Sequence, residues 1–186
     1  MKAVKKALRQ EMLALRASLS DDYRLSSDQA IVEHVLASEL YENAKVVFCF
    51  VSMPGEVNTQ PIIEDAIAKG KVVCVPKVMA KGHMEAFQIK SYNDFEVSDY
   101  GIREPKAGSL LIEPDQIDLG IIPNIVVSKD GYRLGYGGGF YDRYLLRSKM
   151  VRLAVCREAL IQEVLPIEAH DEKVDFIASE TGLIEV

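Results

Sequence analysis

Two apolar runs on either side of a helix-length segment constrain the fold of this chain more than any other feature. Residues 45–53 (KVVFCFVSM) and 71–78 (KVVCVPKV) are rich in β-branched and aromatic side chains, a pattern typical of buried strands. Residues 59–68 have the spacing of a helix, and Gly70 follows as a stop signal. A strand–helix–strand unit implies two parallel strands joined by a crossover helix. The segment therefore predicts an α/β fold.

The rest of the chain continues this alternation. Helices are expected over residues 2–18, from a break at residues 20–22 as far as Leu40, and over residues 140–147. Further strands are expected over residues 84–90, 118–128 (interrupted by Pro123), 151–156 and 174–178, with loops over 91–116. In the first helix, the apolar stripe expected to face the core is Val4, Leu8, Met12, Leu15 and Leu19. We expect one domain over residues 1–186, with a mainly parallel central sheet and helices on both faces.

Composition narrows the class of protein. The chain has 186 residues, of which 48% are hydrophobic and 27% charged, as in an ordinary globular domain. The net charge of −6 disfavours nucleic-acid binding, which usually needs a basic surface. No apolar run approaches the ~18 residues of a membrane span, so no membrane association is expected.

The N-terminus and the cysteines predict a cellular location. The first sixteen residues carry too many charges for a secretory signal. Cys49, Cys74 and Cys156 each stand alone in an apolar run, without a CxxC pair. We therefore expect a cytoplasmic protein with buried, reduced thiols. We also expect it to act as a monomer on small molecules.

The strongest local motif is the glycine-rich segment over residues 133–142 (RLGYGGGFYD), which contains four of the twelve glycines. Glycine allows positive φ angles and close approach of a ligand to the main chain, and consecutive N–H groups can form an anion-binding nest. The segment is not a Walker A loop, because it lacks Gly-Lys-Ser/Thr, and Phe140 stands where a dinucleotide fingerprint has its third glycine. Strand, loop and helix together predict a phosphate site; a tight turn is the alternative.

Several charged residues suit such a site, although each has a simpler reading. Asp142 either compensates the dipole of the following helix or holds Mg²⁺ beside the phosphates. Lys5 and Arg9 share one face of the first helix, where they either offset phosphate charge or are solvated. Arg133 and Arg143 have the same two readings. Glu56 follows a strand end in residues 52–59 (SMPGEVNT), where open α/β sheets bind ligands. His170 and Asp171 match no metal-binding spacing.

Five segments, in order along the chain, carry a resemblance to a known family. They are residues 5–9 (KKALR), 52–59 (SMPGEVNT), 104–105 (EP), 133–145 (RLGYGGGFYDRYL) and 166–175 (PIEAHDEKVD). With these segments the sequence resembles the 5-formyltetrahydrofolate cyclo-ligase family, also called the 5,10-methenyltetrahydrofolate synthetase family. Phe140 is a departure, because the family often has tyrosine there.

The resemblance implies an activity and a set of residues. The activity is the ATP- and Mg²⁺-dependent closure of 5-formyltetrahydrofolate to 5,10-methenyltetrahydrofolate, through phosphorylation of the formyl oxygen and attack by N10. The residues implied for ATP are Lys5, Lys6, Arg9, Arg133, Leu134, Gly135, Tyr136, Gly137, Gly138, Gly139, Phe140 and Tyr141. Those implied for the folate are Val51, Glu56, Tyr136, Gly137, Gly138, Gly139 and Phe140. Arg133 and Tyr141 are implied in catalysis, and Asp142 and Asp171 in holding Mg²⁺.

Two other functions remain open from the residues alone. One is a different ATP-dependent kinase or ligase of small molecules on the same scaffold, which the region of Glu56 would distinguish. The other is a non-catalytic module that binds a nucleotide or folate. Retention of both Asp142 and Asp171 favours an active enzyme.

Overall fold

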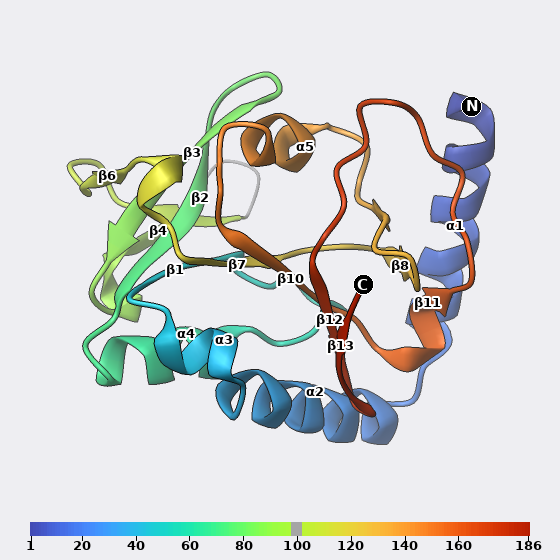
Figure 1. The fold of residues 1–186 in the computed structure, drawn as a ribbon, viewed down its shortest axis with the longest axis horizontal. Helices are drawn as coiled ribbons and strands as arrows, with labels where there is room; N and C mark the ends of the chain where they lie inside the picture. Colours follow the sequence, from blue (N-terminus) through green and yellow to red (C-terminus); the bar gives the residue numbers. More distant parts are fainter. Residues whose placement is uncertain (98–101) are drawn as a thin grey trace.

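An eight-stranded sheet forms the centre of the protein in the computed structural model, which describes residues 1–97 and 102–186 (Figure 1). Its strand order is β13-β12-β10-β7-β1-β2-β3-β6. The bounds are β1 (Val46–Cys49), β2 (Val72–Ala80), β3 (His83–Ile89), β6 (Leu111–Ile112), β7 (Leu119–Ile122), β10 (Val151–Val155), β12 (Phe176–Ser179) and β13 (Gly182–Glu185). Smaller sheets join β4 (Phe95–Val97) to β5 (Arg103–Pro105), and β8 (Val126–Ser128) to β9 (Arg133–Leu134) and β11 (Ile161–Gln162).

The centre of the large sheet is parallel and its margins are antiparallel. β1 pairs in parallel with β2 and β7, and β10 pairs in parallel with β7 and β12. β3, β6 and β13 join in antiparallel register at the two sides. The parallel β1–β2 pair, with its crossover helix, confirms the unit predicted over residues 45–78. The mainly parallel α/β architecture is therefore the one expected.

The helices lie on both faces of the sheet. They are α1 (Lys2–Ser18), α2 (Asp21–Leu36), α3 (Glu39–Asn43), α4 (Gln60–Ala68) and α5 (Phe140–Leu145), with 3₁₀ turns η1 (Tyr92–Asp94), η2 (Pro114–Gln116) and η3 (Glu158–Leu160). Helices α2, α3 and α4 cover one face, at the bottom of Figure 1, and α5 covers the other. None of the described helices is long and apolar enough to cross a membrane.

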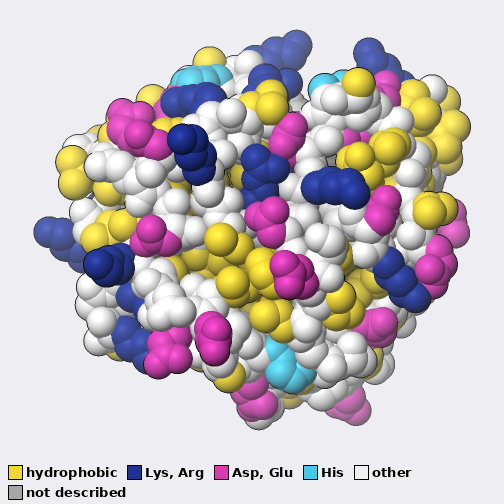
Figure 2. All heavy atoms as spheres, in the orientation of Figure 1, with side chains coloured by type: hydrophobic (Ala, Val, Ile, Leu, Met, Phe, Trp, Pro, Cys, Tyr) yellow, Lys and Arg dark blue, Asp and Glu magenta, His cyan; other side chains and the backbone are white. Residues whose placement is uncertain are grey.

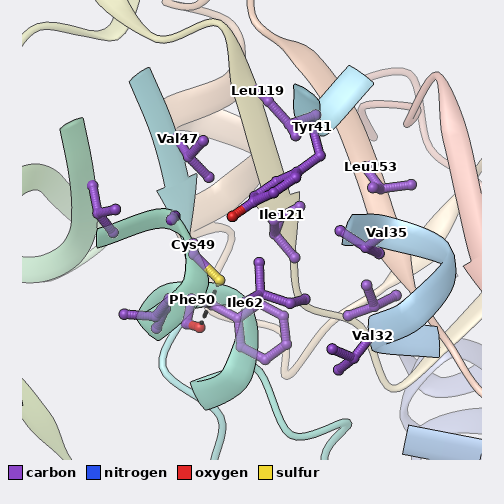
Figure 3. Packing of buried hydrophobic residues seen from close by; sticks show 14 of the residues in the cluster. Val32, Val35, Tyr41, Val47, Cys49, Phe50, Ile62, Leu119, Ile121 and Leu153 are labelled. Atoms are coloured by element: carbon purple, nitrogen blue, oxygen red, sulfur yellow. Dashed lines mark hydrogen bonds between the residues drawn. The ribbon is translucent and has the colours of Figure 1, made fainter. Parts of the chain in front are cut away.

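The core on the face of α2 to α4 is built from alternate strand residues. Val47 and Cys49 of β1 point to the same side as Ile121 of β7, where Ile62 of α4 and Val35 of α2 meet them (Figure 3). Phe48, between the first two, points to the opposite face and stacks on Tyr144 of α5 with ring centroids 5.5 Å apart. Both faces of the strand are thus buried, which explains the unbroken apolar run in its sequence.

Three sequence predictions differ from the structure. The strand expected over residues 118–128 is two strands in two sheets, because Pro123 has no N–H to donate to a ladder. Leu40 belongs to the separate helix α3, which begins after Ser38 caps it through Tyr41 N. The loops expected over residues 91–116 contain short strands and 3₁₀ turns, and residues 98–101 of that stretch lie outside the described part of the chain.

The buried face of the first helix overlaps the predicted apolar stripe only in part. Val4 and Leu15 are exposed, whereas Lys5, Met12 and Arg16 are buried. Met12 packs in a small core with residues of β8 and β9, and this contact fixes the rotation of the helix. The buried side therefore carries two cations, one on either side of Met12, toward the interior of the protein.

Candidate active site

A cavity of about 350 Å³ lies where the parallel strands end. Its walls include Phe50 and Val51 after β1, Pro76 in the middle of β2, and Pro123 after β7. The chain leaves β1 toward β2 on one side and β7 toward β10 on the other, so the sheet reverses its winding between β1 and β7. Open α/β sheets bind ligands at such a switch point, outside the carboxyl ends of the strands.

One wall of the cavity is the loop between β9 and α5. Gly137 and Gly139 have φ angles of +94° and +65°, which L side chains rarely adopt. A Cβ atom on Gly139 would lie 2.8 Å from Arg143 Nη1, so a side chain there would displace the end of Arg143. Within the described residues, none of the glycine N–H groups of residues 135–139 donates a hydrogen bond. The loop can therefore offer main-chain donors to an anion.

Arg133 directly precedes this loop and lines the cavity. Its Nη2 donates to Asp142 Oδ1 at 2.9 Å, and the guanidinium lies over the ring of Tyr141 at 5.7 Å from the centroid. Burial lowers the pKa of Arg133, although the nearby carboxylate of Asp142 opposes the shift. The Nε atom is buried and has no partner among the described residues. The guanidinium is thus held against both Asp142 and Tyr141 at the cavity wall.

Helix α1 delivers two more cations to the same wall. Arg9 Nε donates to Gly135 O at 2.7 Å and so attaches the helix to the glycine loop. Lys5 is 6% exposed and pairs with Asp171 at 2.5 Å and with Glu168 at 3.0 Å. Burial alone would lower the pKa of Lys5, but the two carboxylates raise it above its usual value. Lys5 therefore stays charged beside the cavity.

Asp171 belongs to the same ion-paired group. Burial would raise the pKa of its carboxyl, but hydrogen bonds from Lys5 and from the Glu168 N–H reverse this and lower it. Asp171 is consequently ionised at neutral pH. It faces the cavity from the segment before β12, far in sequence from the glycine loop.

The opposite wall carries Glu56. Its Oε1 accepts a hydrogen bond from the Tyr136 hydroxyl at 2.8 Å, and its Oε2 accepts one from Met53 N at 2.9 Å. Arg16 in turn donates to the Tyr136 hydroxyl at 2.8 Å. The carboxylate is thereby held in one orientation between the glycine loop and the turn after β1. A planar ligand with N–H groups could take its remaining lone pairs.

The surface between these walls is largely apolar. Phe50, Val51, Pro76, Met84 and Phe140 contribute to it. Tyr141 also lines the cavity, and burial, followed by the charge of Glu56, raises the pKa of its hydroxyl. Tyr141 therefore keeps its proton at neutral pH. The cavity has a cationic part around Lys5, Arg9 and Arg133 and an apolar part beside Glu56, an arrangement suited to a ligand pair of unlike chemistry.

The structure brings nearly all of the predicted site residues to this one cavity. Lys6 is the exception: it is exposed on α1 and does not line the cavity, because only the face carrying Lys5 and Arg9 turns inward. The remaining predicted residues, Lys5, Arg9, Val51, Glu56, Arg133, Leu134, Gly135, Tyr136, Gly137, Gly138, Gly139, Phe140, Tyr141, Asp142 and Asp171, all line it. Their individual roles stay predictions.

The structure also corrects two readings and adds one residue. Helix α5 has only six residues, so its dipole contributes little to anion binding. Arg143 donates to Gly138 O and Gly82 O and does not line the cavity, so it braces the loop from outside. Arg16 was missed, yet its spacing of seven residues from Arg9 places both on one helix face.

The donor set suits a divalent cation shared with phosphates. Asp142 and Asp171 both line the cavity, but the described residues contain no cluster of three or more His, Cys, Asp or Glu side chains that could hold a metal alone. Mg²⁺ prefers one or two carboxylates together with phosphate oxygens and water. The two aspartates therefore fit Mg²⁺ that arrives with a nucleotide. They do not form an all-protein cage.

The fold and the cavity define an α/β protein with a ligand cleft at the switch point, the place where nucleotide-binding enzymes of this class hold their ligands. The glycine loop with Lys5, Arg9 and Arg133 could receive a phosphate group, and the apolar surface beside Glu56 leaves room for a second ligand. On the face seen in Figure 2, the Lys and Arg side chains of the described residues are interspersed with Asp and Glu. That face presents no continuous basic surface for a nucleic acid.

Comparison with known proteins identifies the family. The model of the 5-formyltetrahydrofolate cyclo-ligase family matches residues 1–180, and the chain belongs to this family. The mouse 5-formyltetrahydrofolate cyclo-ligase is 30% identical, over 96% of this chain and 94% of its own length. The solution structure of 5,10-methenyltetrahydrofolate synthetase from Aquifex aeolicus is 27% identical, with a TM-score of 0.87 over 98% of this chain and 92% of that one.

A further solved structure shares the fold. The 5,10-methenyltetrahydrofolate synthetase from Mycoplasma pneumoniae is 24% identical, with a TM-score of 0.78 over 95% of this chain and 98% of that one. At this identity the likeness shows the fold alone.

Proposed function

We propose that this protein catalyses the ATP-dependent conversion of 5-formyltetrahydrofolate to 5,10-methenyltetrahydrofolate, with release of ADP and phosphate. One observation carries the proposal: the same cavity has a glycine loop with three cations at one end and an apolar compartment with an oriented carboxylate at the other. The reaction needs both ligands side by side. Since the residues predicted for both substrates come together within a single chain, we also propose that the monomer is active.

The residues divide between the two substrates. The N–H groups of residues 135–139, with Lys5, Arg9 and Arg133, would hold the phosphates of ATP. Glu56 would accept hydrogen bonds from the N–H groups of the pterin, which lies against the apolar wall at Val51 and Phe140. The two ligands would then meet over Tyr136, which bridges the two walls.

Asp142 and Asp171 would hold Mg²⁺ against the phosphate oxygens. When bound, the ion neutralises charge on the transferring phosphoryl group. Arg133 and Lys5, which are paired with these aspartates here, would be released in part toward the phosphates. The carboxylates thus hold the cations in place until a nucleotide supplies competing oxygens.

The chemistry is a phosphoryl transfer followed by ring closure. The formyl oxygen attacks the γ-phosphorus, and the bond to the β–γ bridging oxygen breaks, so ADP leaves. N10 then attacks the activated formyl carbon, and its proton and the phosphate depart. Such a transfer depends mainly on alignment and charge neutralisation. Arg133 and the glycine N–H groups supply both, and no Cys or His nucleophile is required.

The direct test mixes the purified protein with Mg·ATP and 5-formyltetrahydrofolate and follows the methenyl product by its absorbance. Production of one ADP for each methenyl group would support the proposal. If ATP is converted to ADP in the presence of another small molecule but not in the presence of the folate, the protein is a different ATP-dependent enzyme. If both ligands bind without turnover, it is a non-catalytic module, and the proposal fails.

A second test addresses the metal. Asp142→Asn keeps the size of the side chain but removes a charge, so it should raise the Mg²⁺ concentration needed for half-maximal rate. Lys149→Gln, an exposed charge change outside the cavity, is the control. Equal Mg²⁺ dependence of wild type and Asp142→Asn would remove this aspartate from the metal site.

A further inference from the structure

Arg157 is a fully buried cation that lies outside the cavity. It follows β10, at the carboxyl end of the sheet, and is 2% exposed. No residue of the proposed reaction contacts it through a side chain. A buried guanidinium without a role in the reaction needs compensation, and it receives this from four acceptors.

Two of those acceptors belong to the turn that carries Glu56. Nη1 of Arg157 donates to Gly55 O at 2.9 Å, and Nη2 donates to Glu56 O at 3.1 Å. Gly55 has a φ angle of +89°, so its carbonyl is turned in a direction that a regular strand does not offer. The guanidinium therefore fixes the main chain at the two residues that determine where the Glu56 side chain points.

The other two acceptors lie on α2. Nη2 of Arg157 also donates to Asp28 Oδ1 at 2.6 Å, and Nε donates to Ser27 Oγ at 3.2 Å. The second oxygen of Asp28 accepts from Asn58 N at 3.1 Å. Arg157 and Asp28 thus hold both ends of the 55–58 segment and attach it to a rigid helix. The planar fork of arginine suits this set of acceptors, whereas a lysine ammonium lacks the spread.

The side chain of Glu56 is fixed from the opposite direction. Tyr136 and Met53 N occupy one lone pair on each of its oxygens, on the cavity side. Neither contact would hold the carboxylate in place if the main chain behind it could move. Glu56 is therefore held from two sides: Arg157 binds its main chain away from the cavity, and Tyr136 binds its side chain within the cavity.

We propose that Arg157, with Asp28, is a positioning residue for the second substrate: by fixing the main chain of Gly55 and Glu56, it aims the Glu56 carboxylate at the N–H groups of the pterin. This inference rests on the proposed function. It assigns a residue that touches neither ligand to recognition of the folate, and it leaves recognition of ATP to the other wall.

The experiment compares substitutions that keep the fold. Arg157→Lys retains the charge beside Asp28 but cannot reach both carbonyl groups. Asp28→Asn retains the size of that side chain and weakens the anchor to α2. Arg147→Lys is the matched control, because it breaks a two-pronged contact with Glu85 outside the cavity. Thermal unfolding is measured for each variant, so that loss of fold is recognised.

The measured quantities are the KM for each substrate and the change in folate KM that Arg157→Lys causes in a Glu56→Gln background. We expect Arg157→Lys to raise the KM for 5-formyltetrahydrofolate by about tenfold, within the ~hundredfold that a 1 Å misplacement can cost, and to leave the KM for ATP within about twofold. In a Glu56→Gln background, Arg157→Lys should add little, because the carboxylate that it positions is already gone. Arg147→Lys should change neither KM.

Three results would overturn the inference. The first is an equal rise in both KM values, which would indicate a general structural role. The second is a double variant whose rise in folate KM equals the product of the rises in the Arg157→Lys and Glu56→Gln single variants. The third is an unchanged folate KM in folded Arg157→Lys. If instead the wild-type protein makes no methenyl product, the proposed function has failed; isothermal titration of wild type and Arg157→Lys with the folate alone then decides whether Arg157 positions a binding site.

Discussion

The Tyr136 hydroxyl lies 2.8 Å from Glu56 Oε1 and joins the glycine loop to the turn after β1. These two residues are 80 positions apart and belong to the two opposite walls of the cavity. Arg16 completes the contact by donating to the same hydroxyl. The phosphate end and the carboxylate end of the cavity are therefore mechanically connected before any ligand binds.

This connection can be tested with Tyr136→Phe. The ring is kept, but Glu56 loses one donor and Arg16 loses its acceptor. A hydrogen bond to a charged group contributes about 2 kcal/mol, so the KM for the folate should rise by up to roughly thirtyfold. Steady-state kinetics with the folate varied at saturating ATP measures this. Tyr132→Phe, a tyrosine outside the cavity, serves as the control, and equal KM values in the two variants would contradict the connection.

Two glycine-to-alanine variants separate the cost of backbone strain from the effect of changing the cavity loop. Gly139→Ala and Gly70→Ala both place a side chain at positive φ, which costs about 1 kcal/mol in each case. Only at Gly139 does the new Cβ atom meet a neighbour, Arg143, whereas Gly70 has open space within 4 Å. We expect similar losses of unfolding free energy but a fall in kcat/KM for ATP of at least tenfold for Gly139→Ala alone. Matching kinetics in the two variants would contradict a role for the loop.

Arg133 should be irreplaceable by lysine. Its Nη2 donates to Asp142 while the planar guanidinium lies over the ring of Tyr141, whereas an ammonium offers no planar fork. We expect Arg133→Lys to lower kcat by about a hundredfold, as for loss of one preorganised donor to a developing charge. Single-turnover measurement of ADP formation separates this from slow product release. A folded Arg133→Lys enzyme with wild-type kcat would exclude the residue from catalysis.

The Lys5–Asp171 pair predicts a defined pH dependence of stability. The pKa of Asp171 is lowered from its usual 3.8, so its contribution is present above that value and is lost as pH falls through the lower folded pKa. The pKa of Lys5 is raised from 10.5, so its contribution is present below that value and is lost as pH rises through the higher folded pKa. Lys5→Met should therefore cost about 2 kcal/mol between these limits.

Urea unfolding of wild type and Lys5→Met at a series of pH values measures that difference. It should be constant near neutral pH and shrink below about pH 4, where Asp171 takes up a proton. Lys2→Met, an exposed change on the same helix, should show no such dependence. A difference that stays constant into strong acid would contradict the pairing.

The three cysteines should be protected in the folded protein. Cys49, Cys74 and Cys156 are buried and free, as expected from the sequence. Burial raises the pKa of the Cys156 thiol to about 12, and it raises the pKa values of the other two further. Since the thiolate is the reactive form, a disulfide reagent at pH 8 should modify them only after unfolding by guanidinium. Rapid modification of the native protein would contradict this burial.

Local patterns in the sequence determined the elements and the chemistry of the motifs. The apolar run of β1 is unbroken because both of its faces are buried, and the glycines of residues 135–139 mark a loop whose backbone most residue types cannot adopt. Both properties belong to a few consecutive residues, so the sequence displays them directly. The family resemblance then indicated which of these residues belong to a common site.

Only the tertiary structure decided which faces meet. The apolar stripe of α1 pointed outward at Val4 and Leu15, because packing of Met12 against the small sheet set the rotation of the helix and turned Lys5 and Arg16 inward. The same holds for Arg157, an ordinary basic residue in the sequence, whose acceptors are about a hundred or more positions away. Contacts of this kind depend on long-range packing, and no local periodicity records them.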